Sequence, residues 1–342
     1  MVEASLEANG LVKGADVSTE SWEPRMREAS GRIEQALAEI SKKVIGQPRV
    51  GQRLLMALVA GGHVLLEGMP GLAKTTSIKA LAEVCQLHFK RIQFTPDLLP
   101  ADLIGTQIYD PRSAEFKVKK GPIFAHLVLA DEINRAPAKV QSALLEAMEE
   151  KQVTLGEQTY PLEDPFLVLA TQNPIEQEGT YQLPEAQIDR FLMKLKISYS
   201  SPQDEEEIIR RSSLEQMTVD KLLDRHAIRD MRNLVQKVYV SEKIRRYIVD
   251  LVFATRTPKE RGFPDLAPLI EYGASPRASI ALDKLSRVNA FFEGRSFVTP
   301  QDVKDVGMDA LRHRVKLTYE AEADAVGPEQ VISRIFDKVD VP

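Results

Sequence analysis

The chain of 342 residues is 43% hydrophobic and 28% charged, which is typical of a globular protein with one large domain or two of average size. Its formal net charge of −5, from 45 basic and 50 acidic side chains, argues against a dominant nucleic-acid-binding surface. No apolar run approaches the about 20 residues of a membrane span, and the acidic N-terminus lacks the apolar core of a secretory signal. The single cysteine, Cys85, cannot form an internal disulfide. We therefore expect a cytoplasmic protein.

The N-terminal part is expected to be an extension followed by two helices. Residues 1–24 are polar and show no helical or strand period, and we interpret them as a mobile extension. Apolar residues then recur at helical spacing over 24–41 and over 49–60. The segment Val44–Pro48 separates the two predicted helices.

Five short segments are predicted to be β-strands, and those at 127–130 and 166–170 are fully apolar, as in a buried sheet. The five are 63–67, 89–94, 127–130, 166–170 and 193–197. Because helical or turn-rich segments separate them, they favour a mostly parallel five-stranded sheet that is covered on both faces. Two further segments, 105–119 and 152–162, alternate apolar and polar residues around turns and predict β-hairpins. We therefore predict an α/β domain over 25–200.

The pattern changes after residue 200. No convincing strand follows, and helical patterns dominate at 203–215, 226–239, 241–254, 276–293 and 300–312. Thr299 followed by Pro300 is a favourable helix start. We predict an α-helical second domain over 201–342, in which the pattern assigns no element to residues 320–342.

The segment GMPGLAKT, residues 68–75, has the composition of a phosphate-binding loop between a strand and a helix. It departs from GxxxxGK[ST] only at Ala73. Backbone N–H groups and the helix N-terminus would face the phosphates, Lys74 would contact the β- and γ-phosphates, and the Thr75 hydroxyl would bind Mg²⁺. Taken alone, the pattern also fits a tight turn that binds no ligand.

Two carboxylates, Asp131 and Glu132, follow the predicted strand 127–130 directly. Ligands of open α/β sheets bind at the carboxyl ends of the strands. Asp131 is suited to holding Mg²⁺, and Glu132 is suited to polarising the water that attacks the γ-phosphate. Without a phosphate loop nearby, the pair would fit a solvated strand end or a helix cap.

Two polar residues further along the chain could complete such a site. Asn173 follows the strand 166–170 and could orient the attacking water, or could form only an Asn-Pro turn with Pro174. Arg190 precedes the last predicted strand. It is an ordinary surface charge unless another subunit's nucleotide lies opposite, where it could act as an arginine finger.

Several segments in this order resemble the MoxR family of AAA+ ATPases, in the branch with an insert in helix 2. They are GMPGLAKT, LVLADEINRAP, LEAMEEKQVTLG, LATQNP, EGTYQLPEAQIDRF and GASPRAS. The resemblance extends over nearly all of residues 30–315, and Ala73 is the residue that this family's loop carries. It implies an AAA+ P-loop domain followed by a helical lid.

The resemblance also implies roles for single residues. Asn173 resembles sensor 1, Arg190 the arginine finger, and Arg277 the sensor 2 of the lid. The residues implied to contact ATP are Gly68, Pro70, Gly71, Leu72, Ala73, Lys74, Thr75 and Thr76 of the loop and Ile45, Gly46 and Gln47 beside the adenine. Thr75 and Asp131 would hold Mg²⁺ as Walker A and Walker B residues, and Glu132 would be the catalytic Walker B residue. The hairpins at 105–119 and 152–162 would face the pore of a ring.

The activity implied by the resemblance is Mg²⁺-dependent ATP hydrolysis by a homo-oligomeric ring, expected to be a hexamer. Its work would be chaperone-like remodelling or maturation of protein partners, often proteins with a von Willebrand factor A domain. An alternative is a metal-insertion motor similar to the ATPase subunit of magnesium chelatase, which shares the helix-2 insert. A nucleic-acid motor is disfavoured by the acidic net charge. A nucleotide-binding module without turnover is disfavoured by the presence of Glu132 and Asn173.

Overall fold

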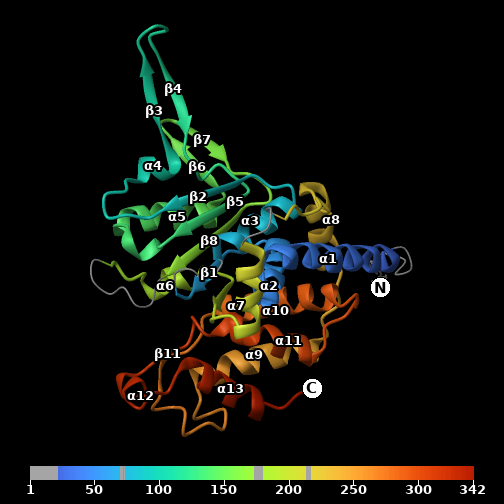
Figure 1. Ribbon diagram of the computed structural model, residues 1–342. Coiled ribbons are helices and arrows are strands. Elements are labelled where there is room, and N and C mark those ends of the chain that lie inside the picture. The colour runs from blue at the N-terminus through green and yellow to red at the C-terminus, as the bar shows by residue number, and fades with distance from the viewer. Residues whose placement is uncertain (1–21, 70–71, 73, 173–179, 213–216) are drawn as a thin grey trace, which may run out of the picture.

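The computed structural model describes residues 22–69, 72, 74–172, 180–212 and 217–342, which form an α/β domain and a helical lid (Figure 1). The strands of the main sheet are β1 (Val64–Glu67), β2 (Phe89–Gln93), β5 (Leu127–Asp131), β8 (Leu167–Gln172) and β9 (Met193–Lys196). They are arranged in the order β2-β5-β8-β1-β9, and every neighbouring pair is parallel. The prediction of a five-stranded, mostly parallel sheet is confirmed. All five carboxyl ends therefore lie at one edge.

The two faces of the sheet bury different hydrophobic clusters because side chains alternate along each strand. Leu127 and Leu129 of β5 belong to a cluster that includes α1 (Glu23–Lys43), α2 (Pro48–Ala60), α3 (Lys74–Val84) and most lid helices. Val128 and Ala130 belong to the second cluster, with α4 (Pro100–Ile104) and α5 (Ala138–Glu150). One face of the sheet and the lid thus share a continuous core.

The first helix begins at Glu23, inside the segment predicted to be an extension. Trp22, the first residue described, is buried in the cluster shared with the lid. Its indole packs where the pattern analysis expected no contact, because a single aromatic residue creates no period.

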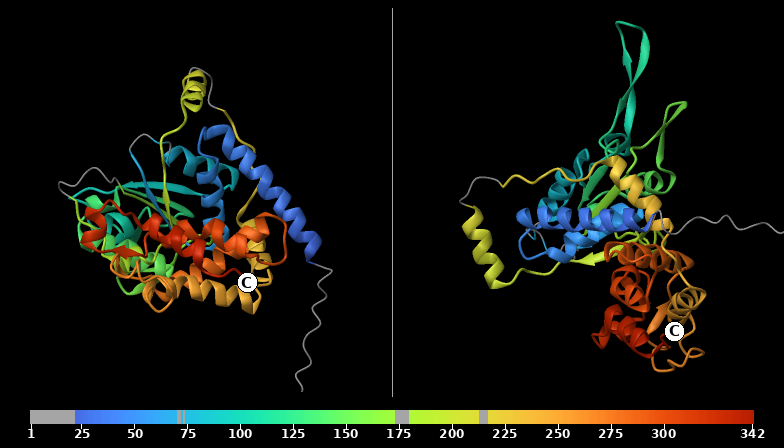
Figure 2. Two further views of the ribbon diagram at one scale, coloured as in Figure 1. Left: turned by 90° about the horizontal axis from the view of Figure 1, so that it is seen from below. Right: turned by 90° about the vertical axis from the view of Figure 1, so that its right-hand side faces the viewer.

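Both predicted hairpins are present. The first consists of β3 (Gly105–Asp110) and β4 (Glu115–Lys120), and the second of β6 (Gln152–Leu155) and β7 (Gln158–Pro161). The longer one extends from the α/β domain at the end away from the lid (Figures 1 and 2). The Tyr109 and Phe116 rings contact each other across its strands, with 5.3 Å between centroids, and both side chains are exposed.

The lid is mostly helical, as predicted. Its helices are α7 (Pro202–Ser212), α8 (Arg225–Gln236), α9 (Glu242–Arg256), α10 (Pro276–Phe292), α11 (Pro300–Leu311), α12 (Tyr319–Ala323) and α13 (Pro328–Lys338). Thr299 caps α11 with a capping box. Helix α7, yellow in Figure 2, lies apart from the other lid helices in both views. No helix in the described ranges combines the length and the apolar character needed to cross a bilayer.

The expectation that no strand follows residue 200 is wrong. Strands β10 (Ile270–Tyr272) and β11 (Lys316–Leu317) pair in a small antiparallel sheet. Strands of three and two residues are too short to show alternation, so pairing across the lid determines them. The pattern also assigns no element to residues 320–342, yet α13 forms there, with Val331, Ile332 and Ile335 buried at helical spacing.

A pair of helix glycines tests the packing of the lid. A Cβ atom on Gly307 of α11 would lie 2.1 Å from Phe336 Cζ, whereas a Cβ on Gly31 of α1 would meet nothing within 4 Å. We expect Gly307→Ala to lower the free energy of unfolding by about 1–3 kcal/mol through overpacking. Gly31→Ala should raise it by about 0.5–1 kcal/mol, because alanine loses less backbone entropy. Urea unfolding followed by circular dichroism measures both, and shifts of the same sign would contradict this packing.

Candidate nucleotide site

The predicted phosphate loop connects β1 to α3 at the carboxyl edge of the sheet. A Cβ on Gly68 would lie 2.8 Å from the Ile197 carbonyl oxygen, so the close approach of β9 requires glycine there. Lys74 is the first residue of α3, and its Nζ donates to the Gly68 carbonyl at 2.5 Å. Burial lowers the pKa of Lys74, and the Asp131 and Glu132 carboxylates oppose this shift. The lysine therefore lies within the field of both carboxylates.

The other loop residues are only partly described. Leu72 and Thr75 are half-buried, and Thr76 is exposed in the first turn of α3. Pro70, Gly71 and Ala73 lie outside the described residues, as does Asn173 beyond β8. A helix leaves its first N–H groups without partners inside the helix and has its positive dipole end there, so the N-terminus of α3 suits an anion.

Glu132 has a left-handed backbone, with φ of 58°, directly after β5. A non-glycine residue in this region needs support from its surroundings. Here the Glu132 N–H donates to Thr171 Oγ1 at 2.8 Å, and the same hydroxyl donates to Asp131 Oδ1 at 2.6 Å. Thr171 is 1% exposed. This one hydroxyl therefore holds the Asp131 carboxylate and the backbone from which the Glu132 side chain extends.

Strand β2 supplies two further contacts that the sequence did not reveal. Gln93 Nε2 donates to Glu132 Oε2 at 2.7 Å, and Arg91 Nη2 donates to Asp131 Oδ2 at 2.6 Å. Arg91 Nη2 also donates to Gln93 Oε1 at 3.0 Å. Gln93 lies opposite Asp131 in the β2–β5 register. That pairing depends on sheet order, which no local pattern in the chain determines.

The donor set fits Mg²⁺ better than a metal held entirely by protein. No group of three or more His, Cys, Asp or Glu side chains suitable for a metal occurs among the residues that the structure describes. Mg²⁺ is usually held by one or two protein oxygens together with phosphates and waters. Asp131 offers a carboxylate, of which Oδ2 pairs with the Arg91 guanidinium, and Thr75 at the start of α3 offers a hydroxyl.

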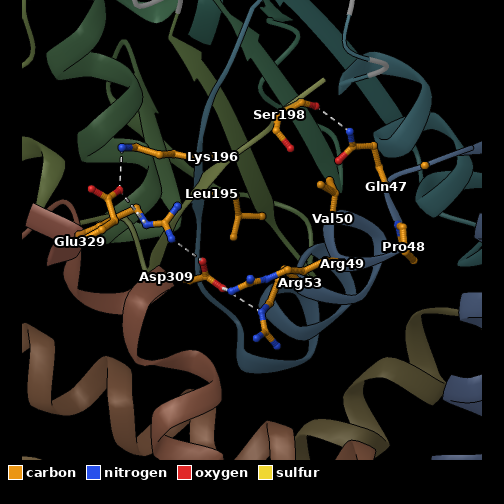
Figure 3. Close-up of a pocket in the computed structure, with 12 residues that line it drawn as sticks. Gln47, Pro48, Arg49, Val50, Arg53, Leu195, Lys196, Ser198, Asp309 and Glu329 are labelled. Atoms are coloured by element: carbon orange, nitrogen blue, oxygen red, sulfur yellow. Dashed lines mark hydrogen bonds and ion pairs between the residues drawn. The ribbon is translucent and has the colours of Figure 1, made fainter. Parts of the chain in front are cut away.

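Gly46 and Gln47, which the resemblance places beside the adenine, line a cavity of about 510 Å³ (Figure 3). Its walls come from the start of α2, the end of β9, α11 and α13. Gln47 Nε2 donates to the Ser198 carbonyl at 2.8 Å, and Arg53 Nε contacts Asp309 Oδ2 at 2.9 Å. Its volume is within the range of small-molecule sites, and it borders the same sheet edge as the loop. Ile45, just before it, is half-buried.

The two predicted arginines lie together, but away from this edge. Arg190 precedes β9, at its amino end, and Arg277 is the second residue of α10. Arg190 Nη1 contacts Glu149 Oε2 at 2.9 Å, and Arg277 Nη2 contacts Glu149 Oε1 at 2.7 Å. Glu149 lies in the last turn of α5, and the carbonyl of Met148 next to it lies 3.1 Å from His63 Nε2, just before β1. The candidate residues thus form two groups, at opposite edges of the sheet.

Thr171 can be tested with a matched pair of variants. Thr171→Val keeps the side-chain volume but leaves the Glu132 N–H and Asp131 Oδ1 without this partner. We expect the free energy of unfolding to fall by about 1–3 kcal/mol, and ATP hydrolysis to fall because Glu132 is no longer held. Thr171→Ser retains the hydroxyl and should stay close to the natural protein in both. Urea unfolding and steady-state ATPase assays measure the effects, and equal behaviour of the two variants would rule out the role of the hydroxyl.

Comparison with known proteins identifies the family. A model of the ATPase family associated with various cellular activities (AAA) matches residues 63–193, and a model of the AAA lid domain matches residues 265–335. Chaperone MoxR1 of Mycobacterium tuberculosis is 47% identical over 310 residues, which are 91% of this chain and 82% of that protein. YeaC of Bacillus subtilis is 42% identical over 309 residues, or 90% of this chain and 94% of that protein.

A solved structure agrees with these relationships. The crystal structure of a Cytophaga hutchinsonii protein matches with a TM-score of 0.90 and 51% identity, covering 94% of this chain and 98% of that one. Fold, lid and sequence therefore agree over almost the whole chain, and the resemblance seen in the sequence is confirmed. The chain belongs to the MoxR family of AAA+ ATPases.

Proposed function

We propose that this protein is a Mg²⁺-dependent ATPase that works as a ring, with each nucleotide site completed by the next subunit. The observation that carries the proposal is the division of the candidate residues between opposite edges of one sheet. Lys74, Asp131 and Glu132 belong to the carboxyl edge, and Arg190 and Arg277 to the amino edge. A repeated contact of one subunit's amino edge with the next subunit's carboxyl edge is heterologous, and it closes into a ring when the rotation permits. A hexamer is the size we propose.

The chemistry assigns a task to each residue at the carboxyl edge. The first turn of α3, with Lys74 and Thr76, would bind the phosphates, and Ile45–Gln47 would contact the adenine. Thr75 and Asp131 would hold Mg²⁺, which neutralises phosphate charge when bound. Glu132 would polarise the attacking water, and Asn173 would orient it. The contacts of Glu132 support this assignment because Thr171 holds its backbone and Gln93 donates to its carboxylate.

The ATPase cycle would drive chaperone-like remodelling of a protein client in the cytoplasm, with a von Willebrand factor A domain protein as the proposed partner. Support comes from a relative named as a chaperone, which favours remodelling over metal insertion. The β3–β4 hairpin adds to it, because its paired Tyr109 and Phe116 rings are exposed on one face and Lys117 and Lys119 are exposed on the other. Such a surface suits contact with a protein chain.

Two variants test the ATPase itself. Lys74→Ala should abolish the rise in melting temperature that ATP causes, because the phosphates lose their main positive charge. Lys79→Ala, exposed on the same helix, should keep that rise and serves as the control. Glu132→Gln should still bind ATP but hydrolyse it about 10²- to 10⁴-fold more slowly, as expected for loss of a general base. Unchanged hydrolysis by Glu132→Gln would refute the assignment of the base.

A mixing experiment tests the shared site. Arg190→Ala retains a complete carboxyl edge, and Lys74→Ala retains a complete amino edge, so neither should hydrolyse ATP efficiently alone. In random rings from equal amounts, about one quarter of the interfaces join an intact loop to an intact arginine, so about one quarter of the natural activity should return. Steady-state ATPase assays over a range of ratios measure this return. No return at any ratio would contradict action across subunits.

A further inference from the structure

We propose that Glu149 is a positioning residue that holds Arg190 and Arg277 as one pair facing the neighbouring subunit's nucleotide. This inference rests on the proposed function, because it assumes that the arginines act across the subunit interface. It adds a residue of the amino edge to the ATPase site.

The geometry gives each guanidinium its own carboxylate oxygen. Arg190 Nη1 lies 2.9 Å from Glu149 Oε2, and Arg277 Nη2 lies 2.7 Å from Glu149 Oε1. The arginines come from different parts of the molecule, one before β9 and one at the start of α10 in the lid. Two cations near each other repel in the absence of an anion between them. The carboxylate therefore sets their spacing.

The end of α5 that carries Glu149 is fixed in the core. The buried His63 accepts a hydrogen bond from the Val168 N–H at Nδ1, 2.9 Å away, and donates from Nε2 to the Met148 carbonyl at 3.1 Å. Burial lowers the pKa of His63 to about 4, so the imidazole is neutral near pH 7 and can make both bonds. Glu149 directly follows Met148, and the His63 contacts hold this end of α5 against β1 and β8.

A different carboxylate fastens the lid at this edge. Asp189 Oδ2 accepts from Ser275 Oγ at 2.6 Å, and Asp189 Oδ1 accepts from Arg314 Nε at 2.8 Å. Arg277 Nη1 lies 3.9 Å from Asp189, beyond hydrogen-bond distance. Lid attachment is therefore assigned to Asp189, and the main partners of Glu149 are the two arginines.

The arrangement leaves donors for an incoming phosphate. A guanidinium carries five N–H donors, and each arginine uses one nitrogen on Glu149. Arg190 Nη1 also donates to the Leu145 carbonyl at 3.1 Å, while its Nε is buried without a hydrogen-bond partner in the described part of the chain. The Arg190 and Arg277 side chains are 32% and 45% exposed. Glu149 therefore orients both groups and leaves them accessible to a phosphate.

The first test separates positioning from folding. Glu149→Gln keeps the shape but can no longer offer a charged oxygen to each arginine, so kcat should fall about 10- to 100-fold from misplacement. KM for ATP should change less than about twofold, because the nucleotide's own contacts lie at the other edge. Glu150→Gln is the matched control, since Glu150 is the next residue, is exposed, and pairs with no other described residue. Equal kcat values for the two variants, or a higher kcat for Glu149→Gln, would overturn the proposal.

The second test asks in which subunit Glu149 acts. Lys74→Ala supplies the arginines to Arg190→Ala in the mixed rings. Adding Glu149→Gln to the Lys74→Ala chain should therefore remove most of the recovered activity, whereas adding it to the Arg190→Ala chain should leave the recovery intact. A purely structural role would not depend on this placement, so equal losses would overturn the proposal. Failure of the parent mixture to recover activity would instead refute the shared site, and the kcat comparison would still decide the role of Glu149.

Discussion

The common direction of the five strands decides where each candidate side chain can lie. In a parallel sheet every strand ends at the same edge, so Glu67, Asp131 and Gln172 are neighbours although they are far apart in sequence. The same rule places the residues before β9 at the opposite edge, where they meet the end of α5. The hydrogen bonds of Thr171 and Gln93 orient side chains at the carboxyl edge, and the contacts of Glu149 orient the two arginines at the amino edge. The carboxyl edge of the sheet therefore carries the carboxylates, and the amino edge carries the arginines.

Much of this arrangement could be predicted from the sequence because it is local. The apolar runs, the glycine-rich segment before Lys74 and both hairpins have signals within about ten residues. The contacts that the sequence does not predict join residues far apart in the chain. Arg91 and Gln93 reach Asp131 and Glu132 only because β2 pairs with β5, and Arg277 meets Glu149 across 128 residues of chain. Trp22 and the short strands β10 and β11 have no periodic signal, whereas α13 has one that a closer look at Val331–Phe336 would detect.

The lid is joined to the α/β domain at both borders by charged groups of low exposure. At the cavity of Figure 3, Arg53 and Asp309 pair with side chains 7% and 3% exposed. At the other border, Arg314 is 2% exposed and pairs with Asp189. Removing one partner of such a pair leaves a buried charge, which costs more than the intact pair contributes. These contacts hold the lid in one orientation. They therefore fix the position of the cavity at one edge of the sheet relative to the Arg190–Arg277 pair at the other.

The continuous hydrophobic cluster shared by α1, α2, α3 and the lid has a consequence for folding cooperativity. Trp22 and Met26 of the N-terminal region pack in the same cluster as Leu285 and Phe291 of α10. Segments that share one hydrophobic core unfold together. The cooperative unit is therefore set by this cluster and not by the change in composition near residue 200. The first helix and the lid therefore form one cooperative unit assembled from opposite ends of the chain. The lid should therefore reach its full stability only when the N-terminal helices are packed against it.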